Sequence, residues 1–341
     1  MTYTGKILAI AYPDTFVRFS DDLMLSLLSY IGIGKNKYVK AGHAAMVLVE
    51  NATGKALYYD FGRYVTPEGK GRVRSAETDV ELQLPYSAEI NTKNEWANVD
   101  KFLMWLSTNL DKTHGSGRMV AAVCDHIDYD RAFKFVTRLQ QNGSMSYRAF
   151  GSGASSNCSR LVTDTILAST DHRRIRFWLT RNNLFSPSPI GNAYHAALSN
   201  PVFEVDKGQI RRYTKSVLRE NTTNYFDQKI PGPSEKSDIP DHLEDAHYLS
   251  GIGCGAYFKI FEMKQSRRYI IERYTDQGDI DFRGIFESTE NINMYQPYQF
   301  TYDSHCLYCH ILQNNTKIRL DRKQILDVKE PSQLVQRKRG A

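Results

Sequence analysis

The chain has 341 residues, of which 41% are hydrophobic and 24% charged, and its 44 Lys and Arg against 38 Asp and Glu give a formal net charge of +6. At about 150 residues per domain, this length predicts two domains with ordinary hydrophobic cores. The composition is that of a globular protein and excludes the disordered and collagen-like classes. The basic excess is too small for the basic face of a nucleic-acid-binding protein, so we expect no nucleic-acid partner.

Cysteine usage and the N-terminal sequence bear on the cellular compartment. Five cysteines are too few, and odd in number, for a disulfide scaffold of this length. The N-terminus lacks the pattern of a signal peptide, and no apolar run approaches the ~18 residues of a membrane-spanning helix. These observations predict a soluble, cytoplasmic protein without a membrane span.

The N-terminal part of the chain begins with strand and helix signals in alternation. Gly5–Ala11 is a short apolar run that predicts a buried strand. Ser20, followed by two aspartates and an apolar stretch, predicts a helix that extends to Ile31. His43–Val49 is apolar on both alternating faces, which is typical of a strand covered on both sides. Ala56–Phe61 then completes a hairpin.

The same alternation of elements continues along the chain. Arg72–Leu84 and Met119–Cys124 have the pattern of strands. Apolar residues recur at helical spacing over Glu95–Leu110, and Asp128 is a suitable N-cap for a second helix that ends near Gln141. Helical spacing returns after Asn157, which predicts that the next residue, a cysteine, lies in the first turn of a helix.

We place a domain boundary near Asn200, with an α+β domain over residues 1–200 and a mostly antiparallel β-rich domain over residues 201–341. A candidate helix at Gln209–Leu218 and a linker at Ile230–Pro240 follow the boundary. The remaining sequence has short alternating segments separated by turn residues, which predicts a series of strands. These predicted strands are Ala256–Met263, Arg268–Tyr274, Asp281–Phe286, Tyr298–Tyr302, Cys306–Leu312 and Lys317–Leu320.

Cys158 has the position of a nucleophile. A thiol attacks as its thiolate, and the unpaired N–H groups at a helix N-terminus lower the pKa of a thiol there. The same N–H groups can stabilise the oxyanion that forms when a thiolate attacks a carbonyl. His43, at the head of an apolar strand with small neighbours, is a candidate base to accept the thiol proton.

These motifs resemble those of a known superfamily. A Gly-His pair that opens an apolar strand at His43, a hairpin return at Leu57–Phe61, and an Asn157-Cys158 pair that opens a helix are similar to the circularly permuted NlpC/P60 branch of the papain-like fold. This branch includes bacterial amidase-like hydrolases and lecithin:retinol acyltransferase-like proteins. The resemblance covers about residues 1–200. It implies a Cys158 nucleophile, a His43 base, and Asp60 as the third residue, which orients the histidine.

Pairing geometry leaves the identity of the third catalytic residue open. If the hairpin turns simply at Thr53-Gly54, Tyr64 lies opposite His43, and Asp60 lies about 13 Å further along the strand at ~3.3 Å per residue. An asymmetric loop would be needed to bring Asp60 to the histidine. The lecithin:retinol acyltransferase-like members have a histidine at this position, so the aspartate departs from their pattern. Tyr59 and Tyr64 therefore stay as alternatives to Asp60.

The sequence leaves three functions open. The first is a cysteine hydrolase, an amidase or peptidase that forms an acyl-enzyme and acts on a peptide or another amide-containing substrate, such as a peptidoglycan-type link. The second is a non-catalytic binding or scaffold protein, in which Cys158 is an inert thiol on the apolar face of its helix. The third is an acyltransferase with the same Cys-His pair. The β-rich domain would limit access to the site or bind a protein partner.

Cofactor and metal signatures are weak. Glycine-rich segments lack the Lys-Ser/Thr ending of a phosphate-binding loop and the third glycine of a dinucleotide site. The segment His305–His310 contains a C-x-x-C pair flanked by histidines, which invites a zinc site. Residues three apart in an extended strand face opposite sides, however, so packed strand thiols are the favoured interpretation. We expect neither a cofactor nor a metal.

Overall fold

The computed structural model divides the chain into two compact units. The N-terminal unit consists of residues 1–62, 69–76 and 82–233, and the C-terminal unit consists of residues 63–68, 77–81 and 234–341. The predicted helix over residues 20–31 and the predicted linker over residues 230–240 lie almost wholly outside the described residues. The structure describes residues 3–18, 30–149, 155–184, 186–229 and 240–329.

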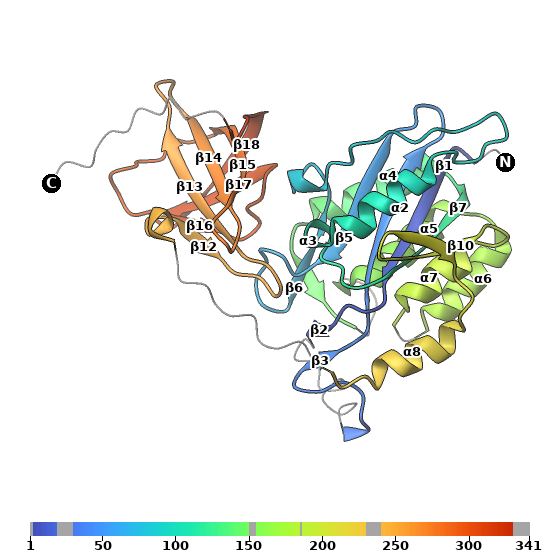
Figure 1. Ribbon diagram of the computed structural model, residues 1–341. Helices are drawn as coiled ribbons and strands as arrows, with labels where there is room; N and C mark the ends of the chain where they lie inside the picture. The colour runs from blue at the N-terminus through green and yellow to red at the C-terminus, as the bar shows by residue number, and fades with distance from the viewer. Residues whose placement is uncertain (1–2, 19–29, 150–154, 185, 230–239, 330–341) are drawn as a thin grey trace. The chain divides into compact units, whose positions relative to one another are not determined.

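A nine-stranded sheet forms the centre of the N-terminal unit (Figure 1). Its spatial order is β11-β10-β7-β1-β4-β5-β6-β8-β9, and the neighbouring strands pair antiparallel except for β8 and β9. The predicted α+β class is therefore confirmed. The strands are β1 (Gly5–Tyr12), β4 (His43–Glu50), β5 (Ala56–Gly62), β6 (Lys70–Arg74), β7 (Met119–Ile127), β8 (Met145–Tyr147), β9 (Ser155–Ser156), β10 (Val202–Asp206) and β11 (Gln209–Arg212), and β2 (Val17–Arg18) and β3 (Tyr38–Val39) form a separate pair.

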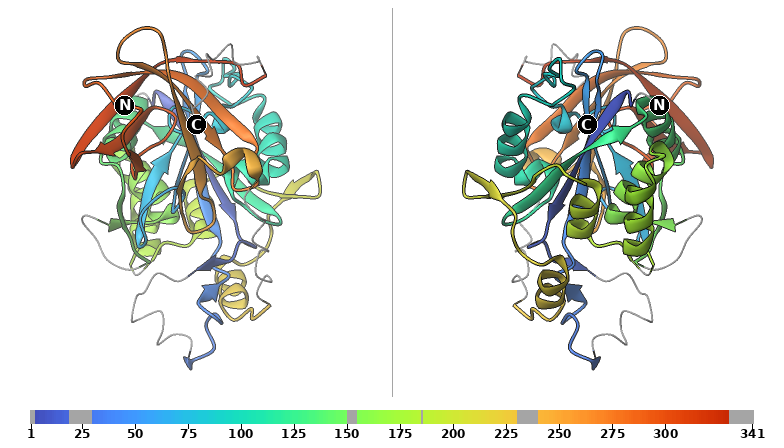
Figure 2. Two further views of the ribbon diagram at one scale, coloured as in Figure 1. Left: turned by 90° about the vertical axis from the view of Figure 1, so that its left-hand side faces the viewer. Right: turned by 90° about the vertical axis from the view of Figure 1, so that its right-hand side faces the viewer.

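Helices cover both faces of this sheet, which explains why β1 and β4 are apolar on both of their alternating sides. One face packs against residues of α4, α5, α6 and α7, and the other against α2. Figure 2 shows the blue strands between these two layers. The helices are α2 (Val99–Thr108), α3 (Leu110–Thr113), α4 (Tyr129–Gln141), α5 (Cys158–Ser169), α6 (Arg173–Asn182), α7 (Pro189–Ala196) and α8 (Val217–Tyr225).

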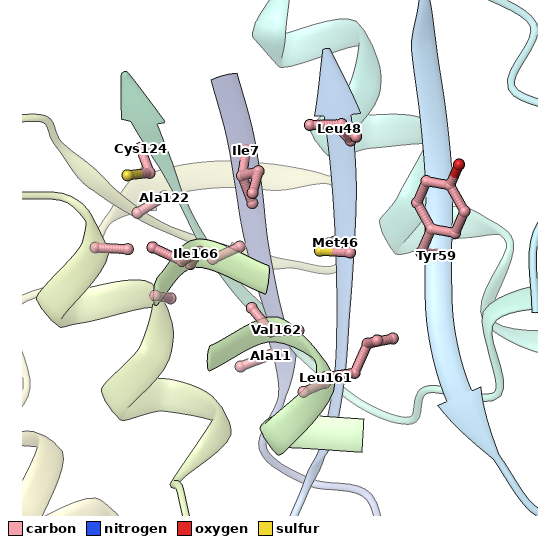
Figure 3. Close-up of a cluster of buried hydrophobic side chains, with 14 of the residues drawn as sticks. Ile7, Ala11, Met46, Leu48, Tyr59, Ala122, Cys124, Leu161, Val162 and Ile166 are labelled. Carbon is pink, nitrogen blue, oxygen red and sulfur yellow. The ribbon is translucent and has the colours of Figure 1, made fainter. Parts of the chain in front are cut away.

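The core between α5 and the sheet positions the helix that begins at Cys158. Leu161, Val162 and Ile166 lie on the face of α5 that packs on the sheet, and all three are fully buried (Figure 3). Their partners include Ala11 of β1 and Met46 of β4. Because the interior is close-packed, the N-terminus of α5 is fixed against the sheet.

Several predicted elements differ from the structure. The strand predicted over Arg72–Leu84 ends at Arg74, and a short 3-10 helix occupies Val80–Leu82. The helix predicted at Gln209–Leu218 is wrong, because Gln209–Arg212 is strand β11, paired with β10 across a turn, and the helix begins only after its N-cap, Ser216. β10 in turn pairs with β7, so the N-terminal unit extends past the boundary predicted near residue 200.

The C-terminal unit has its own core and a seven-stranded antiparallel sheet in the order β12-β13-β14-β15-β18-β17-β16. The β-rich character predicted from its turn spacing is confirmed. No helix in the described part of the chain is long and apolar enough to cross a bilayer. The strands are β12 (His247–Leu249), β13 (Ala256–Glu262), β14 (Arg268–Tyr274), β15 (Ile280–Ser288), β16 (Gln299–Thr301), β17 (Tyr308–Gln313) and β18 (Thr316–Ile325), and a 3-10 helix covers Asp241–Leu243.

Candidate active site

Cys158 is the first residue of α5, as the sequence predicts. Asn157 is the N-cap: its side-chain oxygen accepts a hydrogen bond from the N–H of Arg160 at 2.8 Å, and its Nδ2 donates to the carbonyl of Arg148 at 2.9 Å. Asn157 is itself buried, so the cap is rigid. The thiol therefore lies at the positively polarised end of the helix, where backbone N–H groups have no intrahelical acceptor.

His43 is the first residue of β4 and lies beside Tyr12, its cross-strand partner on β1. The two rings stack with their centroids 6.3 Å apart and an angle of 14° between their planes. Gly42, just before the histidine, has φ +79°, and a Cβ there would lie 3.1 Å from the carbonyl oxygen of Tyr12. Glycine is therefore required for the chain to enter the strand in this way.

The register between β4 and β5 brings Asp60 to His43. Asp60 pairs directly with Ala45, which places it diagonally across from His43 on the same face of the sheet. The aspartate Oδ2 lies 3.7 Å from the histidine Nε2. A simple turn at Thr53-Gly54 would pair Asp60 with Val47, but Lys55 pairs with Glu50 instead and shifts the register by two residues. The register is uniform along the hairpin, which turns over residues 51–54, so the position of the turn and not an asymmetric loop brings Asp60 close to His43.

Asp60 is wholly buried and held by two further side chains. Arg74 on β6 is its direct cross-strand partner, and its Nε and Nη2 donate to the two carboxylate oxygens at 2.9 and 2.5 Å. The hydroxyl of Tyr58 donates to Oδ2 at 3.0 Å. Burial acts to raise the pKa of Asp60, but the charge and hydrogen bonds of Arg74 and the nearby His43 hold that pKa well below its ordinary value. The carboxylate is therefore ionised at neutral pH.

The thiol of Cys158 and the imidazole of His43 interact electrostatically, and each changes the pKa of the other. Burial opposes the charged form of both groups. The interactions of His43 with Asp60 and Cys158 nevertheless raise the pKa of His43 to about 9, and the interaction with His43 lowers the pKa of Cys158. Opposite pKa shifts of this kind mean that the thiolate and the imidazolium stabilise each other.

Two more donors reach the sulfur and help to lower the pKa of Cys158. The hydroxyl of Tyr147 has its oxygen 4.0 Å from Sγ, and the backbone N–H of Ala44 also acts to lower the pKa of the thiol. No local sequence signal marks Tyr147, or Arg74 and Tyr58, the two partners of Asp60, as residues of the site. Alternation along the strands would have found Tyr58 and Arg74 once the register was known, because both share the face of Asp60.

The alternative third residues have different positions. Tyr59 is adjacent to Asp60 on β5 and therefore faces the opposite side of the sheet, where it is buried in the core with Met46. Tyr64 belongs to the C-terminal unit, separate from the unit that contains His43. Asp60 is thus the candidate that the structure brings together with His43.

The other cysteines have unreactive surroundings. Burial raises the pKa of Cys124 to about 12, and burial also raises the pKa values of Cys306 and Cys309. Cys254 is half-buried. Within the described ranges, no three His, Cys, Asp or Glu side chains form a group that could hold a metal ion.

Comparisons with known proteins match the two units to different families. Residues 7–175 match the family described as Type VI secretion system effector TseH-like, and residues 246–323 match the DUF6695 C-terminal domain. No curated protein matches the chain. Among solved structures, the crystal structure of the Type VI secretion system effector TseH is 17% identical with a TM-score of 0.41, covering 62% of this chain and 98% of that one.

The N-terminal unit is thus similar to TseH-like effectors, a family with the papain-like NlpC/P60 fold. This agrees with the superfamily expected from the residues around His43 and Cys158. The permuted branch of that superfamily stays a prediction.

Proposed function

We propose that the protein is a cysteine hydrolase in which Cys158 is the nucleophile, His43 the general acid and base, and Asp60 the residue that orients the histidine. The observation that carries this proposal is the placement of Cys158 at the N-terminus of α5 together with His43 beside Asp60, an arrangement that lowers the pKa of the thiol and raises that of the imidazole. A buried structural thiol would show the opposite shift, as Cys124 does.

In the proposed reaction, the Cys158 thiolate attacks the carbonyl carbon of an amide. The developing oxyanion accepts hydrogen bonds from N–H groups in the first turn of α5. The His43 imidazolium donates its proton to the leaving amine, and the C–N bond breaks to leave a thioester on Cys158. His43 then takes a proton from water, the hydroxide displaces the thiolate, and a carboxylic acid is released.

For the substrate, we propose an amide in a peptide or a peptidoglycan-type link. The match of residues 7–175 to TseH-like effectors supports this class and supports a role as a type VI secretion system effector. Such a role would take the protein out of the cytoplasm, the location expected from the sequence, and would give it access to cell-wall material. The C-terminal unit would then bind a partner protein or limit access to the site.

Thiol reactivity tests the proposed nucleophile. The full-length protein is treated with iodoacetamide between pH 5 and 10, and alkylation of each cysteine is followed by mass spectrometry of its peptide. We expect Cys158 to react at pH values where Cys124 does not, and His43→Gln to remove this difference. Equal rates for the two cysteines across the pH range would contradict the proposal and favour a non-catalytic scaffold.

Product analysis distinguishes hydrolysis from acyl transfer. The wild-type protein and Cys158→Ala are incubated with purified peptidoglycan and, separately, with an acetyl ester in the presence of a competing amine or alcohol. A hydrolase releases free amino groups or acetate and forms little transfer product. Transfer products in excess of hydrolysis would instead assign the pair to an acyltransferase. The Cys124→Ala protein is the matched control and should retain full activity.

A further inference from the structure

Helix α6 has aromatic rings on its solvent-facing side. Ile175 and Leu179 bury the other side of the helix in the core. Phe177 and Trp178 are 54% and 40% exposed, and Leu184, just after the helix, is 69% exposed. Large apolar side chains that gather in this way on a soluble unit mark an interaction surface more often than isolated ones do.

The exposed rings continue from α6 onto the adjacent α7. Trp178 stacks on His195 with a centroid distance of 5.4 Å and an angle of 5°, and Phe177 lies edge-on to Trp178 at 5.2 Å. Tyr194, which is 48% exposed, lies edge-on to His195 at 5.6 Å. Burial lowers the pKa of His195, so this ring is neutral at pH 7. Four rings therefore form one uncharged row that is already ordered.

Arginines flank this row, and Asp171, the exposed carboxylate next to them in the sequence, is paired with Arg131. The residues from His172 to Phe203 include four arginines and no Asp, Glu or Lys. Arg176 is used internally, because its Nη1 donates to two carbonyls at the end of α5. Arg173 and Arg174 are exposed, and the guanidinium of Arg181 lies 5.4 Å from the ring centre of Phe177. The surface is therefore both aromatic and cationic.

We propose that this surface binds the anionic headgroup region of a lipid bilayer. We call it the aromatic–arginine face, and it consists of Arg173, Arg174, Phe177, Trp178, Arg181, Leu184, Tyr194 and His195. Trp and Tyr rings prefer the interface between headgroups and acyl chains, and arginines pair with lipid phosphates at the same depth. The net charge of +6 adds a general attraction to an anionic surface. Binding would be peripheral, without a membrane span.

Vesicle co-sedimentation of the full-length protein tests this proposal. The probes are vesicles of phosphatidylcholine alone and of phosphatidylcholine with about one third phosphatidylglycerol. We expect binding to the anionic vesicles that weakens as salt is raised, and little binding to the neutral ones. Phe177→Ser with Trp178→Ser, and separately Arg174→Glu with Arg181→Glu, should each reduce the affinity by about tenfold or more.

Matched controls come from exposed residues elsewhere on the same unit. Leu218→Ser on α8 and Arg212→Glu on β11 remove an exposed apolar side chain and an exposed arginine, and should leave vesicle binding unchanged. Far-UV circular dichroism and the melting temperature check that each variant folds. Failure of the wild-type protein to bind anionic vesicles would overturn the proposal, and so would wild-type affinity in both double variants. Binding to an acidic protein or polyglutamate but not to vesicles would also overturn it, in favour of a protein partner.

This experiment is independent of the proposed hydrolase activity. A protein with alkylated Cys158 should bind vesicles as the untreated protein does, because the aromatic–arginine face does not include the thiol. Loss of one property therefore does not imply loss of the other.

Discussion

Arg74 and Asp60 form a buried, two-point ion pair between neighbouring strands, with the guanidinium Nε and Nη2 on the two carboxylate oxygens. Neither residue is more than 1% exposed. Paired hydrogen bonds fix the orientation of the carboxylate as well as its charge. Because Oδ2 of this carboxylate also lies 3.7 Å from Nε2 of His43, Arg74 acts as a positioning residue for the proposed catalytic histidine.

Substitution of Arg74 should therefore affect both stability and catalysis. Arg74→Met leaves a buried carboxylate with less compensation, and we expect it to lower the free energy of unfolding by about 3–5 kcal/mol. Arg74→Lys keeps the positive charge but loses the two-point geometry, so we expect a stable protein with a reduced kcat and a nearly unchanged KM. Denaturant unfolding and steady-state kinetics check these outcomes. A lysine variant with the wild-type kcat would show that Arg74 has only a structural role.

The pH dependence of catalysis should reflect the coupled pair of Cys158 and His43. At low pH the thiolate is protonated, so the rate should rise with pH up to a point below the ordinary thiol pKa of about 8.5. Above pH ~9 the imidazolium loses its proton and can no longer protonate the leaving group. We expect a bell-shaped profile of kcat/KM. A rate that still rises above pH 10 would contradict the ion pair.

Tyr147 should tune the thiolate without being required for the reaction. Its hydroxyl reaches Sγ at 4.0 Å, which is a long and therefore weak hydrogen bond. Tyr147→Phe should raise the pKa of Cys158, because the thiolate loses one donor that stabilises its charge. The pH dependence of iodoacetamide alkylation measures this shift directly. If the pH dependence of alkylation is unchanged in Tyr147→Phe, Tyr147 does not influence the pKa of Cys158.

Because the pKa of Asp60 is lowered in the folded protein, the stability of the N-terminal unit should depend on pH in the acidic range. A carboxylate with a lowered folded-state pKa contributes stability that is fully present above the unfolded value of about 3.9 and is lost as pH falls through the folded-state value. Melting temperatures should therefore fall steeply below pH ~4 in the wild-type protein. Asp60→Asn should be less stable at pH 7 but lose less of its stability on acidification. Parallel pH curves for the two proteins would contradict this.

The sequence was sufficient to predict the two site residues that have short-range signals beside them, Cys158 and His43. Cys158 follows an N-cap, and His43 follows a glycine that opens an apolar strand, so both could be placed on their elements from short-range signals. Asp60 could be named, but its distance from His43 depends on the register of a hairpin, and a five-residue loop is compatible with more than one register. The structure resolves this through the pairing of Lys55 with Glu50.

The features that could not be predicted from the sequence depend on how the strands pair with one another. Arg74 reaches Asp60 only because β6 pairs with β5, and the intervening loop gives no indication of that register. Local sequence is also insufficient at Gln209–Arg212, because four residues fit both a helical and a strand pattern. The pairing of this segment with β10 makes it a strand. The extent of the N-terminal unit also depended on a non-local pair, that of β10 with β7.

The division of the chain has a consequence for synthesis on the ribosome. The C-terminal unit includes residues 63–68 and 77–81, yet about 150 residues are translated between Glu81 and Ser234, where the rest of that unit begins. At ~5–20 residues per second, these two short segments wait on the order of ten seconds or more before their native partners emerge. Val65 and Val80 stay without a core during that interval. The C-terminal unit therefore cannot be completed until synthesis has passed the whole N-terminal unit, and a single cut in the gene cannot separate the two units.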